Sequence, residues 1–510
     1  MNVLFVHNSF PAQYKHLARA LTRDPRVRVA AVGAARSRMS APVDYRRYVL
    51  TDGDVSATHP FARRFDLECR RAEQVLYALS SLSSSGFEPD VVLAHPGWGE
   101  ALPLRPLFPK ARILLYCEFF YRLAEQDVGF DPEFANVGAD GLIGLHLKNA
   151  ATLLSLSDCD FGVSPTAWQR STYPQECQKK IEVIHEGIDT EIVKPQPEAV
   201  FRLSSGRELR SSDEVVTFVA RNLEPLRGYH IFMRALPEIL RARPRAQILV
   251  IGAEGTSYGR LPPEGKSWRS IFYEEVADKI DASRVHFTGT LSYLNFLRAL
   301  QVSSAHIYLT YPFVLSWSLL EAMSAGCLVI GSDTAPVREV IHEGNGILTP
   351  FFDQDALSDR VISALARPRR YFDLRAEARR TVLSRYDLES VCLPKILDLV
   401  YEKRTALAAP LRERGSRKRT RQANGEAKIS ENSRVGEATA LGELRHARRS
   451  RPQHLDRIGA PEEEPGPQGR RRTQAAGWRS RRERGQADRR RSRRPLGLPG
   501  RRCALDRLGR

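Results

Sequence analysis

The sequence lacks the features that mark disulfide-rich, zinc-binding and membrane-spanning proteins. Its seven cysteines lie far apart, without a Cys-x-x-Cys pair, and several stand inside apolar runs, as buried free thiols do. This spacing favours a reducing compartment over a disulfide framework. No apolar stretch approaches the roughly 18 residues that cross a bilayer, and the first residues have no basic region of the kind that opens a signal peptide. We therefore expect a cytoplasmic protein, at most attached to the inner face of a membrane.

The formal net charge of +18 comes from one end of the chain. Residues 404–510 hold 30 Lys and Arg against 12 Asp and Glu, whereas residues 1–403 hold 48 of each sign. Hydrophobic residues make up 42% of the whole chain and charged residues 27%, which is typical of a globular protein. The folded part is therefore neutral, and its partners cannot be inferred from the basic isoelectric point.

Residues 404–510 contain 28 Arg but only two Lys, with many Gly and Pro and few large apolar side chains. A segment of this composition cannot bury enough surface to offset the entropy of ordering it, so we expect a disordered tail. Three interpretations stay open, in order of preference: sequence read in a wrong frame of a high-GC gene, a solvated tail, and an arm for nucleic acid or acidic lipid. We do not expect nucleic acid as a partner of the folded part.

Short apolar runs alternate with longer amphipathic segments up to residue 403. Runs of this length, punctuated by Gly and Pro, indicate buried parallel strands joined by crossover helices. The first series is Val3–Val6, Val29–Val32, Val91–Ala94, Ile113–Tyr116 and Phe161–Ser164, and the second is Val215–Ala220, Gln247–Ile251, Val285–Thr288, Ile307–Leu309 and Leu328–Ile330. Two series predict an α/β protein with two doubly wound Rossmann-like domains, 1–195 and 213–386. Residues 387–403 have helical spacing and are expected to pack back on the first domain.

The most informative stretch runs from Tyr311 to Gly326. We expect a strand to end near Tyr311, Ser316 or Ser318 to cap the following helix, and Gly326 to end it. The start of such a helix carries exposed N–H groups and a partial positive charge of roughly +0.5, which suit a diphosphate. Glu321 lies about one turn into the helix, where its carboxylate could accept hydrogen bonds from the diol of a ribose. Capping of backbone groups or pairing with an arginine stays open for Glu321.

Two arginines, Arg221 and Arg227, flank the loop after the strand Val215–Ala220. Two guanidinium groups on one loop can hold a pyrophosphate, each charge-assisted bond being worth roughly 1.5–3 kcal/mol. Taken alone, both could equally be surface arginines. Their combination with the stretch from Ser316 to Glu321 favours the phosphate-binding interpretation.

These residues resemble a known family. The pattern Arg221-x5-Arg227-Gly, followed by Ser318-Leu-Leu-Glu321-Ala-Met-x-x-Gly, is similar to the retaining glycosyltransferases of family 4, which have the GT-B fold of two Rossmann-like domains facing a cleft. The resemblance covers roughly residues 1–400. It implies that Arg221 and Arg227 bind the donor diphosphate and Glu321 the ribose, with Ser316, Ser318 and Leu319 in the same donor-binding turn.

Three departures accompany the resemblance. The family pairs its ribose-binding Glu with another Glu eight residues earlier, which contacts the donor sugar; Phe313 stands at that position here. Arg227 replaces the usual Lys, which keeps the charge and offers a fork geometry. Ala12 stands in the first loop where Gly is usual, so the approach of backbone to phosphate is expected to be tighter.

In the first domain, His95-Pro-Gly97-Trp-Gly-Glu follows a predicted strand. Ligands bind at the carboxyl ends of such strands, and the resemblance places a histidine that contacts the donor sugar near His95. A histidine satisfied by a backbone carbonyl is the alternative. Glu118 is a candidate for the acceptor side, although a solvated side chain beside an aromatic core is the plainer interpretation. Gly252 resembles the loop that meets the nucleotide base, or is a plain strand-to-helix turn.

The hypothesis is a metal-independent transferase that needs no cofactor beyond its nucleotide-diphosphate-sugar donor and passes the sugar, with retention, to a sugar, lipid-linked or small-molecule acceptor. The arginines and the helix start would stabilise the departing diphosphate. Four alternatives stay open: a nucleotide-sugar epimerase, a phosphorylase-like enzyme, an inactive nucleotide-sugar-binding protein, and a nucleic-acid binder acting through the tail. The sequence does not identify the sugar, base or acceptor.

Overall fold

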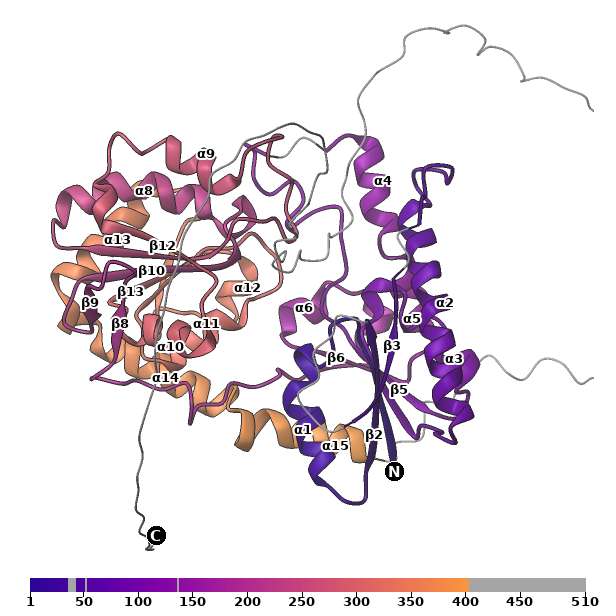
Figure 1. The fold of residues 1–510 in the computed structure, drawn as a ribbon. Coiled ribbons are helices and arrows are strands. Elements are labelled where there is room, and N and C mark those ends of the chain that lie inside the picture. Colours follow the sequence, from indigo (N-terminus) through magenta and orange to yellow (C-terminus); the bar gives the residue numbers. More distant parts are fainter. Residues whose placement is uncertain (35–42, 51–52, 135–136, 403–510) are drawn as a thin grey trace, which may run out of the picture. The chain divides into compact units, whose positions relative to one another are not determined.

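The structure, a computed structural model, describes residues 1–34, 43–50, 53–134 and 137–402. Within these residues the first half of the chain forms a seven-stranded parallel sheet in the order β3-β2-β1-β4-β5-β6-β7 (Figure 1). Its order changes direction between β1 and β4, so the sheet is doubly wound with its switch point there. The strands are β1 (Asn2–Val6), β2 (Arg28–Ala34), β3 (Asp44–Tyr48), β4 (Val91–Ala94), β5 (Arg112–Tyr116), β6 (Phe161–Ser164) and β7 (Ile181–Val183).

Helices cover both faces of this sheet (Figure 1). On one face, side chains of α2 and α3 such as Leu79 and Leu104 pack with Leu4 of β1. On the other face, α1 and the C-terminal helix α15 pack with Phe5. The helices of this half are α1 (Lys15–Arg23), α2 (Arg63–Ser84), α3 (Leu104–Leu107), α4 (Ala139–Leu147), α5 (Ala150–Asp158), α6 (Ala167–Ser171) and α7 (Gln175–Gln178), with 3-10 turns η1 (Ala12–Tyr14) and η2 (Pro96–Trp98).

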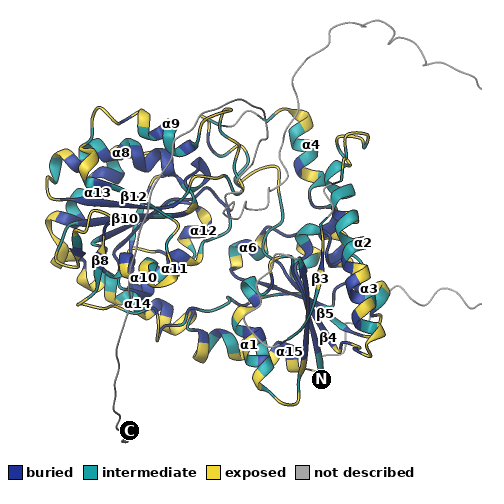
Figure 2. Cartoon of the chain, in the orientation of Figure 1, coloured by how far each residue is buried: buried dark blue, intermediate teal, exposed yellow. Residues whose placement is uncertain are grey.

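The second half forms a six-stranded parallel sheet in the order β12-β11-β10-β13-β14-β15. Its switch point lies between β10 and β13, so this sheet is also doubly wound. The strands of both sheets are mostly dark blue in Figure 2, as expected for parallel strands covered on both faces. The strands of the second sheet are β10 (Val215–Asn222), β11 (Gln247–Ala253), β12 (Val285–Gly289), β13 (Ala305–Tyr308), β14 (Val329–Ser332) and β15 (Ile347–Thr349).

Two groups of helices bury the faces of the second sheet. Phe232 of α8 and Leu357 of α13 belong to the cluster on one face, and Leu300 of α10 and Met323 of α11 belong to the cluster on the other. The helices are α8 (Tyr229–Ala242), α9 (Trp268–Glu274), α10 (Tyr293–Gln301), α11 (Trp317–Ser324), α12 (Ala335–Arg338), α13 (Gln354–Ala366) and α14 (Phe372–Arg385), with 3-10 turns η3 (Pro225–Arg227), η4 (Ala282–Arg284) and η5 (Pro368–Tyr371).

The chain passes between the two sheets twice. An antiparallel pair, β8 (Val200–Arg202) and β9 (Glu208–Arg210), lies between them in sequence. After α14, a π-helical turn (Leu388–Cys392) leads into α15 (Leu393–Tyr401), whose Leu399 and Val400 are buried against the first sheet. The boundaries 1–195, 213–386 and 387–403 stay predictions, and the predicted disordered tail 404–510 lies outside the described residues.

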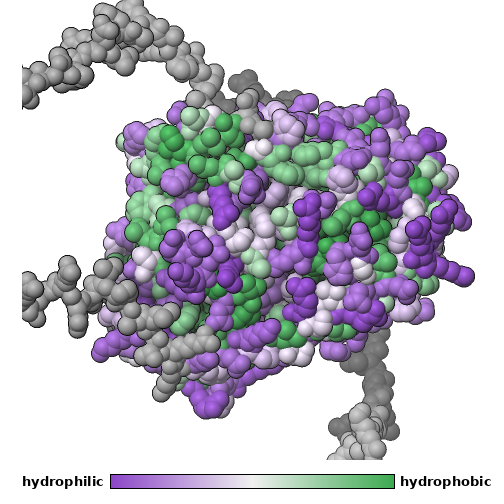
Figure 3. Space-filling model, turned by 180° about the vertical axis from the view of Figure 1, so that it is seen from behind, coloured by the Kyte–Doolittle hydropathy of each residue, from purple (hydrophilic) through white to green (hydrophobic). Residues whose placement is uncertain are grey.

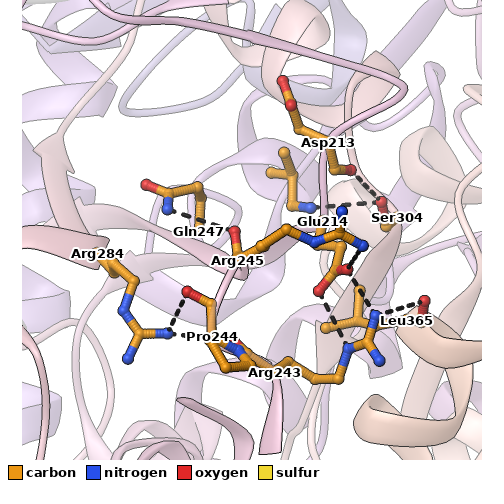
Figure 4. A network of polar contacts seen from close by, with 10 residues as sticks. Asp213, Glu214, Arg243, Pro244, Arg245, Gln247, Arg284, Ser304 and Leu365 are labelled. Atoms are coloured by element: carbon orange, nitrogen blue, oxygen red, sulfur yellow. Dashed lines mark hydrogen bonds and ion pairs between the residues drawn. The ribbon is translucent and has the colours of Figure 1, made fainter. Parts of the chain in front are cut away.

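A polar network closes the amino-terminal edge of the second sheet, which is the edge away from the carboxyl ends of its strands (Figure 4). Glu214, just before β10, accepts hydrogen bonds from Arg243 at 2.5 Å and Arg245 at 3.1 Å. Arg284, just before β12, donates to the carbonyls of Arg243 and Pro244. This network connects the residues that precede β10, β11 and β12, and it therefore stabilises the packing of these strands.

All ten predicted strands are confirmed, and the strands Val91–Ala94 and Phe161–Ser164 have the predicted bounds. The apolar runs of the sequence do not mark β3, β7, β8, β9 and β15. These are short or polar strands, and β3, β7 and β15 lie at sheet edges where one side of the strand is left uncovered, so the long apolar runs of central strands are not needed.

The surface seen from behind mixes hydrophilic and hydrophobic residues in patches (Figure 3).

Candidate functional site

The carboxyl ends of the strands at a switch point are the usual place for a ligand in a doubly wound sheet. In the second sheet β10 pairs with β13, Phe218 lying beside Ile307. Arg221 lies near the end of β10, Arg227 in the following turn η3, and residues 309–316 connect β13 to α11. The two predicted arginines and the predicted helix turn therefore lie at the same edge of this sheet.

Arg227 contacts the loop that enters α11. Its Nη1 donates to Thr310 Oγ1 and to the carbonyl of Val314, both at 3.0 Å, and its guanidinium lies 5.7 Å from the centre of the Phe313 ring. Gly228 ends the turn with φ +69°, and a Cβ there would lie 2.3 Å from the nearest side-chain carbon. Only glycine fits this conformation and contact without strain. The backbone conformation therefore fixes the position from which the Arg227 side chain extends.

Arg221 is exposed near the end of β10. Burial raises the pKa of the Tyr258 phenol to about 12, the charge of Glu118 adds to this rise, and the charges of Arg221 and Arg227 oppose it. The Tyr258 ring centre lies 5.1 Å from that of Phe313. Both arginines thus lie within electrostatic range of one phenol.

Ser316 caps the start of α11, as the sequence indicates. Its Oγ accepts from the Ser318 N–H at 3.3 Å and lies 2.9 Å from Ser318 Oγ. The helix ends before Gly326, which has φ +84° and provides the left-handed residue that commonly follows a helix. The Leu319 side chain is buried in the core, and its N–H donates to the Ser316 carbonyl at 3.1 Å. The structure thus gives Leu319 a packing role, and its contact with substrate stays a prediction.

Glu321 lies one turn into α11 and is half-buried. The Tyr293 hydroxyl donates to its Oε1 at 2.8 Å. Burial raises the pKa of the Glu321 carboxyl, and the Tyr293 bond and the charge of Lys15 oppose the rise. Lys15 begins α1 beside the first sheet, so a residue from each half of the chain acts on this carboxyl. The predicted ribose contact is compatible with this setting, because one oxygen is oriented by Tyr293.

His95 lies at the switch point of the first sheet, where β1 and β4 pair through Val6 and Ala94. The histidine is buried, its Nδ1 accepts from the Gly97 N–H at 3.0 Å, and its Nε2 lies 3.3 Å from Glu118 Oε2. The indole of Trp98 stacks on the imidazole with a centre-to-centre distance of 3.9 Å. The structure therefore brings together His95, Gly97 and Glu118. Because both ring nitrogens of His95 have a partner, the orientation of the imidazole is fixed.

Two further predicted positions are held by backbone geometry. Ala12, in the first loop, has φ +37°, which lies in the left-handed region that costs a non-glycine residue roughly 1–2 kcal/mol. Gly252 lies in β11, where a Cβ would approach the Ala220 carbonyl oxygen to 2.6 Å. Close packing of strand ends accounts for Gly252, and its predicted contact with the base stays a prediction.

Phe313, at the position where the resemblance expects a carboxylate, is 2% exposed. Its ring centre lies 4.8 Å from that of Phe119, a residue that follows β5 of the first sheet. Sequence analysis did not single out Phe119, Tyr258 or Tyr293. All three come from loops or a helix start outside the motifs, and their proximity to the site arises only from tertiary structure.

One group of potential metal ligands lies apart from these residues. Single ligand atoms of Asp131, Glu133 and His230 all lie within 4.8 Å of one another. Arg234 binds both Glu133 oxygens, at 2.7 and 2.9 Å, and the Tyr311 hydroxyl donates to Asp131 at 2.6 Å. The chain's own donors thus already satisfy these carboxylates, and a cation here would face the arginine charge. The expectation of a metal-independent reaction stays a prediction.

Comparison with solved structures identifies the architecture. Sucrose-phosphate synthase from Thermosynechococcus elongatus is 17% identical with a TM-score of 0.59, covering 79% of this chain and 99% of that one. Anabaena HepE, solved in complex with UDP, is 14% identical with a TM-score of 0.55, covering 78% and 99%. Two doubly wound Rossmann-like domains of this kind form the GT-B fold.

Sequence models give the family. Residues 25–193 match the model described as Glycosyl transferase family 4 group, and residues 202–381 match Glycosyl transferases group 1. The chain therefore belongs to the family 4, group 1 glycosyltransferases, a family that a retaining mechanism fits.

Curated relatives match over part of their length. A D-inositol 3-phosphate glycosyltransferase of Mycobacterium ulcerans is 26% identical over 178 residues, which are 34% of this chain and 35% of that protein. A phosphatidyl-myo-inositol mannosyltransferase of Mycobacterium leprae is 29% identical over 182 residues, 34% and 43% respectively. The matches thus span less than half of these relatives. No helix among the described residues is both long and apolar enough to cross a membrane.

Proposed function

We propose that this protein is a retaining glycosyltransferase that moves a sugar from a nucleotide-diphosphate-sugar to an acceptor hydroxyl. The observation that carries the proposal is the contact between Arg227 and the loop entering α11, through Thr310 and Val314. It supports a single diphosphate site built from the arginine pair and the helix start. Family membership supports the same reaction.

In this proposal Arg221, Arg227 and the first N–H groups of α11 hold the diphosphate and stabilise its charge as it leaves. Preorganised donors of this kind need no reorganisation during the reaction, which makes them effective electrostatic catalysts. Two arginines supply the positive charge, so we propose transfer without a metal. The acceptor hydroxyl attacks from the face of the leaving group, which gives retention, and the departing diphosphate takes the hydroxyl proton.

His95 would contact the donor sugar. Because its Nδ1 accepts the Gly97 N–H, the neutral ring carries its proton on Nε2, which points to Glu118. A polarised Nε2–H can donate to a sugar hydroxyl or to the ring oxygen. Glu321 would accept from the ribose, with Tyr293 holding its other oxygen.

Relatives named for D-inositol 3-phosphate and phosphatidyl-myo-inositol support our choice of acceptor class. We propose a polyhydroxylated acceptor, free or lipid-linked, with peripheral contact to the inner face of the membrane in the second case. The proposed location is the cytoplasm.

The test is a thermal melting screen of the purified protein against a panel of nucleoside diphosphates and nucleotide-sugars. A true donor at 100 times its Kd stabilises the fold by about 2.7 kcal/mol, which is a readily measured rise in Tm. The stabilising donor is then incubated with and without polyol acceptors. Arg221→Ala should lower turnover by orders of magnitude. An unchanged rate in that variant, or epimerised donor formed without acceptor, would refute the proposal.

A further inference from the structure

A small cavity lies on the face of the first sheet that α1 and α15 cover. Its volume is about 50 Å³, and its apolar walls include Leu17 of α1, Leu114 of β5 and Leu393 of α15. A volume of this size has room for about four water-sized or methylene-sized groups. The cavity is therefore large enough for part of a ligand rather than for a whole one.

The polar lining of the cavity comes from Gln13, Tyr14, Tyr116, His185 and Glu186. Tyr116 ends β5 and Glu186 follows β7, so this end lies at the carboxyl edge of the sheet, where ligands bind. The Tyr116 hydroxyl donates to Glu186 Oε1. Burial raises the pKa of the Glu186 carboxyl to about 7, and a hydrogen bond with Trp317 opposes this rise. A carboxyl of this kind can accept from a hydroxyl group or donate to it.

Two observations point to a ligand in this cavity, and the first of them connects it with the transfer site. Trp317, which lowers the pKa of Glu186, is the first residue of α11 and is 48% exposed. Tyr14 is 5% exposed, and its buried hydroxyl has no hydrogen-bond partner among the described residues. A buried hydroxyl without a partner costs about 1–3 kcal/mol. A ligand hydroxyl at this point would relieve that cost.

We propose that this cavity is the apolar part of the acceptor site, and that the acceptor is an amphiphilic alcohol: its hydroxylated end lies at Tyr14, Tyr116 and Glu186, and a short aliphatic portion enters between α1 and α15. The inference rests on the proposed function, because it places the acceptor beside the start of α11. It adds that the acceptor carries an apolar chain, supplied by a lipid or by a free amphiphile.

The experiment measures the Kd of n-alkyl glucosides, from methyl to octyl, by calorimetry below their micelle concentrations. Each methylene that enters the cavity should tighten binding about fourfold. The gain should stop after about four methylenes, when the cavity is full. A series without chain-length dependence, or one that rises steadily to octyl, overturns the inference.

Two variants test the location. Leu393→Phe fills the cavity and should flatten the series, whereas Leu397→Phe, on the same helix but outside the cavity lining, should leave it unchanged. Tyr14→Phe should weaken binding of every glucoside about five- to tenfold, with an unchanged or higher Tm, because it removes a hydroxyl that lacks a partner. Equal series in both leucine variants, or normal binding by Tyr14→Phe, contradict the proposal.

Competition separates the two sources of the chain. Vesicles containing a long-chain glycolipid that displace octyl glucoside identify a lipid acceptor, and glucoside binding that resists such vesicles identifies a free amphiphile; both results support the cavity. Nucleoside diphosphate binding is measured on the same samples. If the nucleotide binds while the glucosides show no chain-length dependence, this inference falls and the proposed function stands. If no nucleotide binds, the proposed function falls by itself.

Discussion

Replacing Arg227 with glutamine removes one positive charge from the loop that enters α11 while keeping an amide that can donate hydrogen bonds. In the structure Nη1 holds Thr310 and Val314 at 3.0 Å. The guanidinium carries five N–H donors, which gives it the fork geometry for a diphosphate. A charge-assisted bond contributes about 1.5–3 kcal/mol. Losing one such bond therefore weakens nucleoside diphosphate binding about 10- to 150-fold.

The assay is calorimetric titration of the nucleoside diphosphate that stabilises the protein in the melting screen, followed by kcat/KM with the matching nucleotide-sugar. Arg227→Lys keeps the charge but not the fork, so its loss should be about tenfold. Arg245→Gln is the control, because Arg245 is an exposed arginine of the same domain at the opposite edge of its sheet. If Arg227→Gln binds the diphosphate within threefold of the unchanged protein while its Tm is preserved, the convergence of the two arginines on a diphosphate is wrong.

Three further predictions follow from single contacts. Gly228 has φ +69°, and a Cβ there would lie 2.3 Å from a side-chain carbon, so Gly228→Ala should lower the free energy of unfolding in urea by about 2–3 kcal/mol. Gly206 has φ +87° with open space around it, so Gly206→Ala should lose only the conformational part of about 1–2 kcal/mol. Equal losses in the two variants would contradict the steric argument. Tyr293→Phe removes the hydrogen bond to Glu321, the carboxyl that we propose binds the ribose. It should raise the Kd of the nucleotide about fivefold with kcat nearly unchanged, and an unaltered Kd would separate Tyr293 from the site. Burial raises the pKa of Glu186 to about 7 and lowers the pKa of His185, whose Nε2 lies 3.4 Å from Glu186 Oε2, to about 4. As the pH rises from 4.5 to 7 the protonated Glu186 carboxyl loses about 3 kcal/mol of stability, while the neutral His185 gains a similar amount between pH 4 and 6.5. The free energy of unfolding should therefore rise with pH in Glu186→Gln more steeply than in the unchanged protein. A pH profile that is the same in both proteins would show that the carboxyl is ionised in the fold.

The central strands could be predicted because their residues are buried on both faces. A run such as Val91–Ala94 has no other stable place than the interior of a parallel sheet, and the structure gives it the predicted bounds. The edge strand Asp44–Tyr48 contains charged and aromatic residues in a mixed pattern and is only partly buried. Local sequence does not distinguish such a segment from a loop, because its pairing depends on the neighbouring strand.

In the candidate site, too, features set by local sequence could be predicted and those set by tertiary contacts could not. Ser316 and Gly326 could be assigned because helix starts and ends use local chemistry, a side-chain cap and a left-handed glycine. Tyr258 and Phe119 could not, because each reaches Phe313 from a segment far away in sequence. The Leu319 side chain is buried in the core, which its place in the helical pattern explains, and its contact with substrate stays a prediction.

In the function that we propose, the aromatic surroundings of Phe313 take the place of a carboxylate at this position. Phe119 and Tyr258 enclose its ring, and the Arg227 guanidinium lies over one face at 5.7 Å. A glutamate here would pair with the guanidinium and reduce the positive charge available to a diphosphate, whereas an aromatic ring attracts the guanidinium through its π electrons by about 0.5–2 kcal/mol without neutralising it. In the proposed mechanism Arg227 therefore keeps its charge for the leaving group, and Glu118, 3.3 Å from His95 Nε2, is the carboxylate that we expect beside the donor sugar.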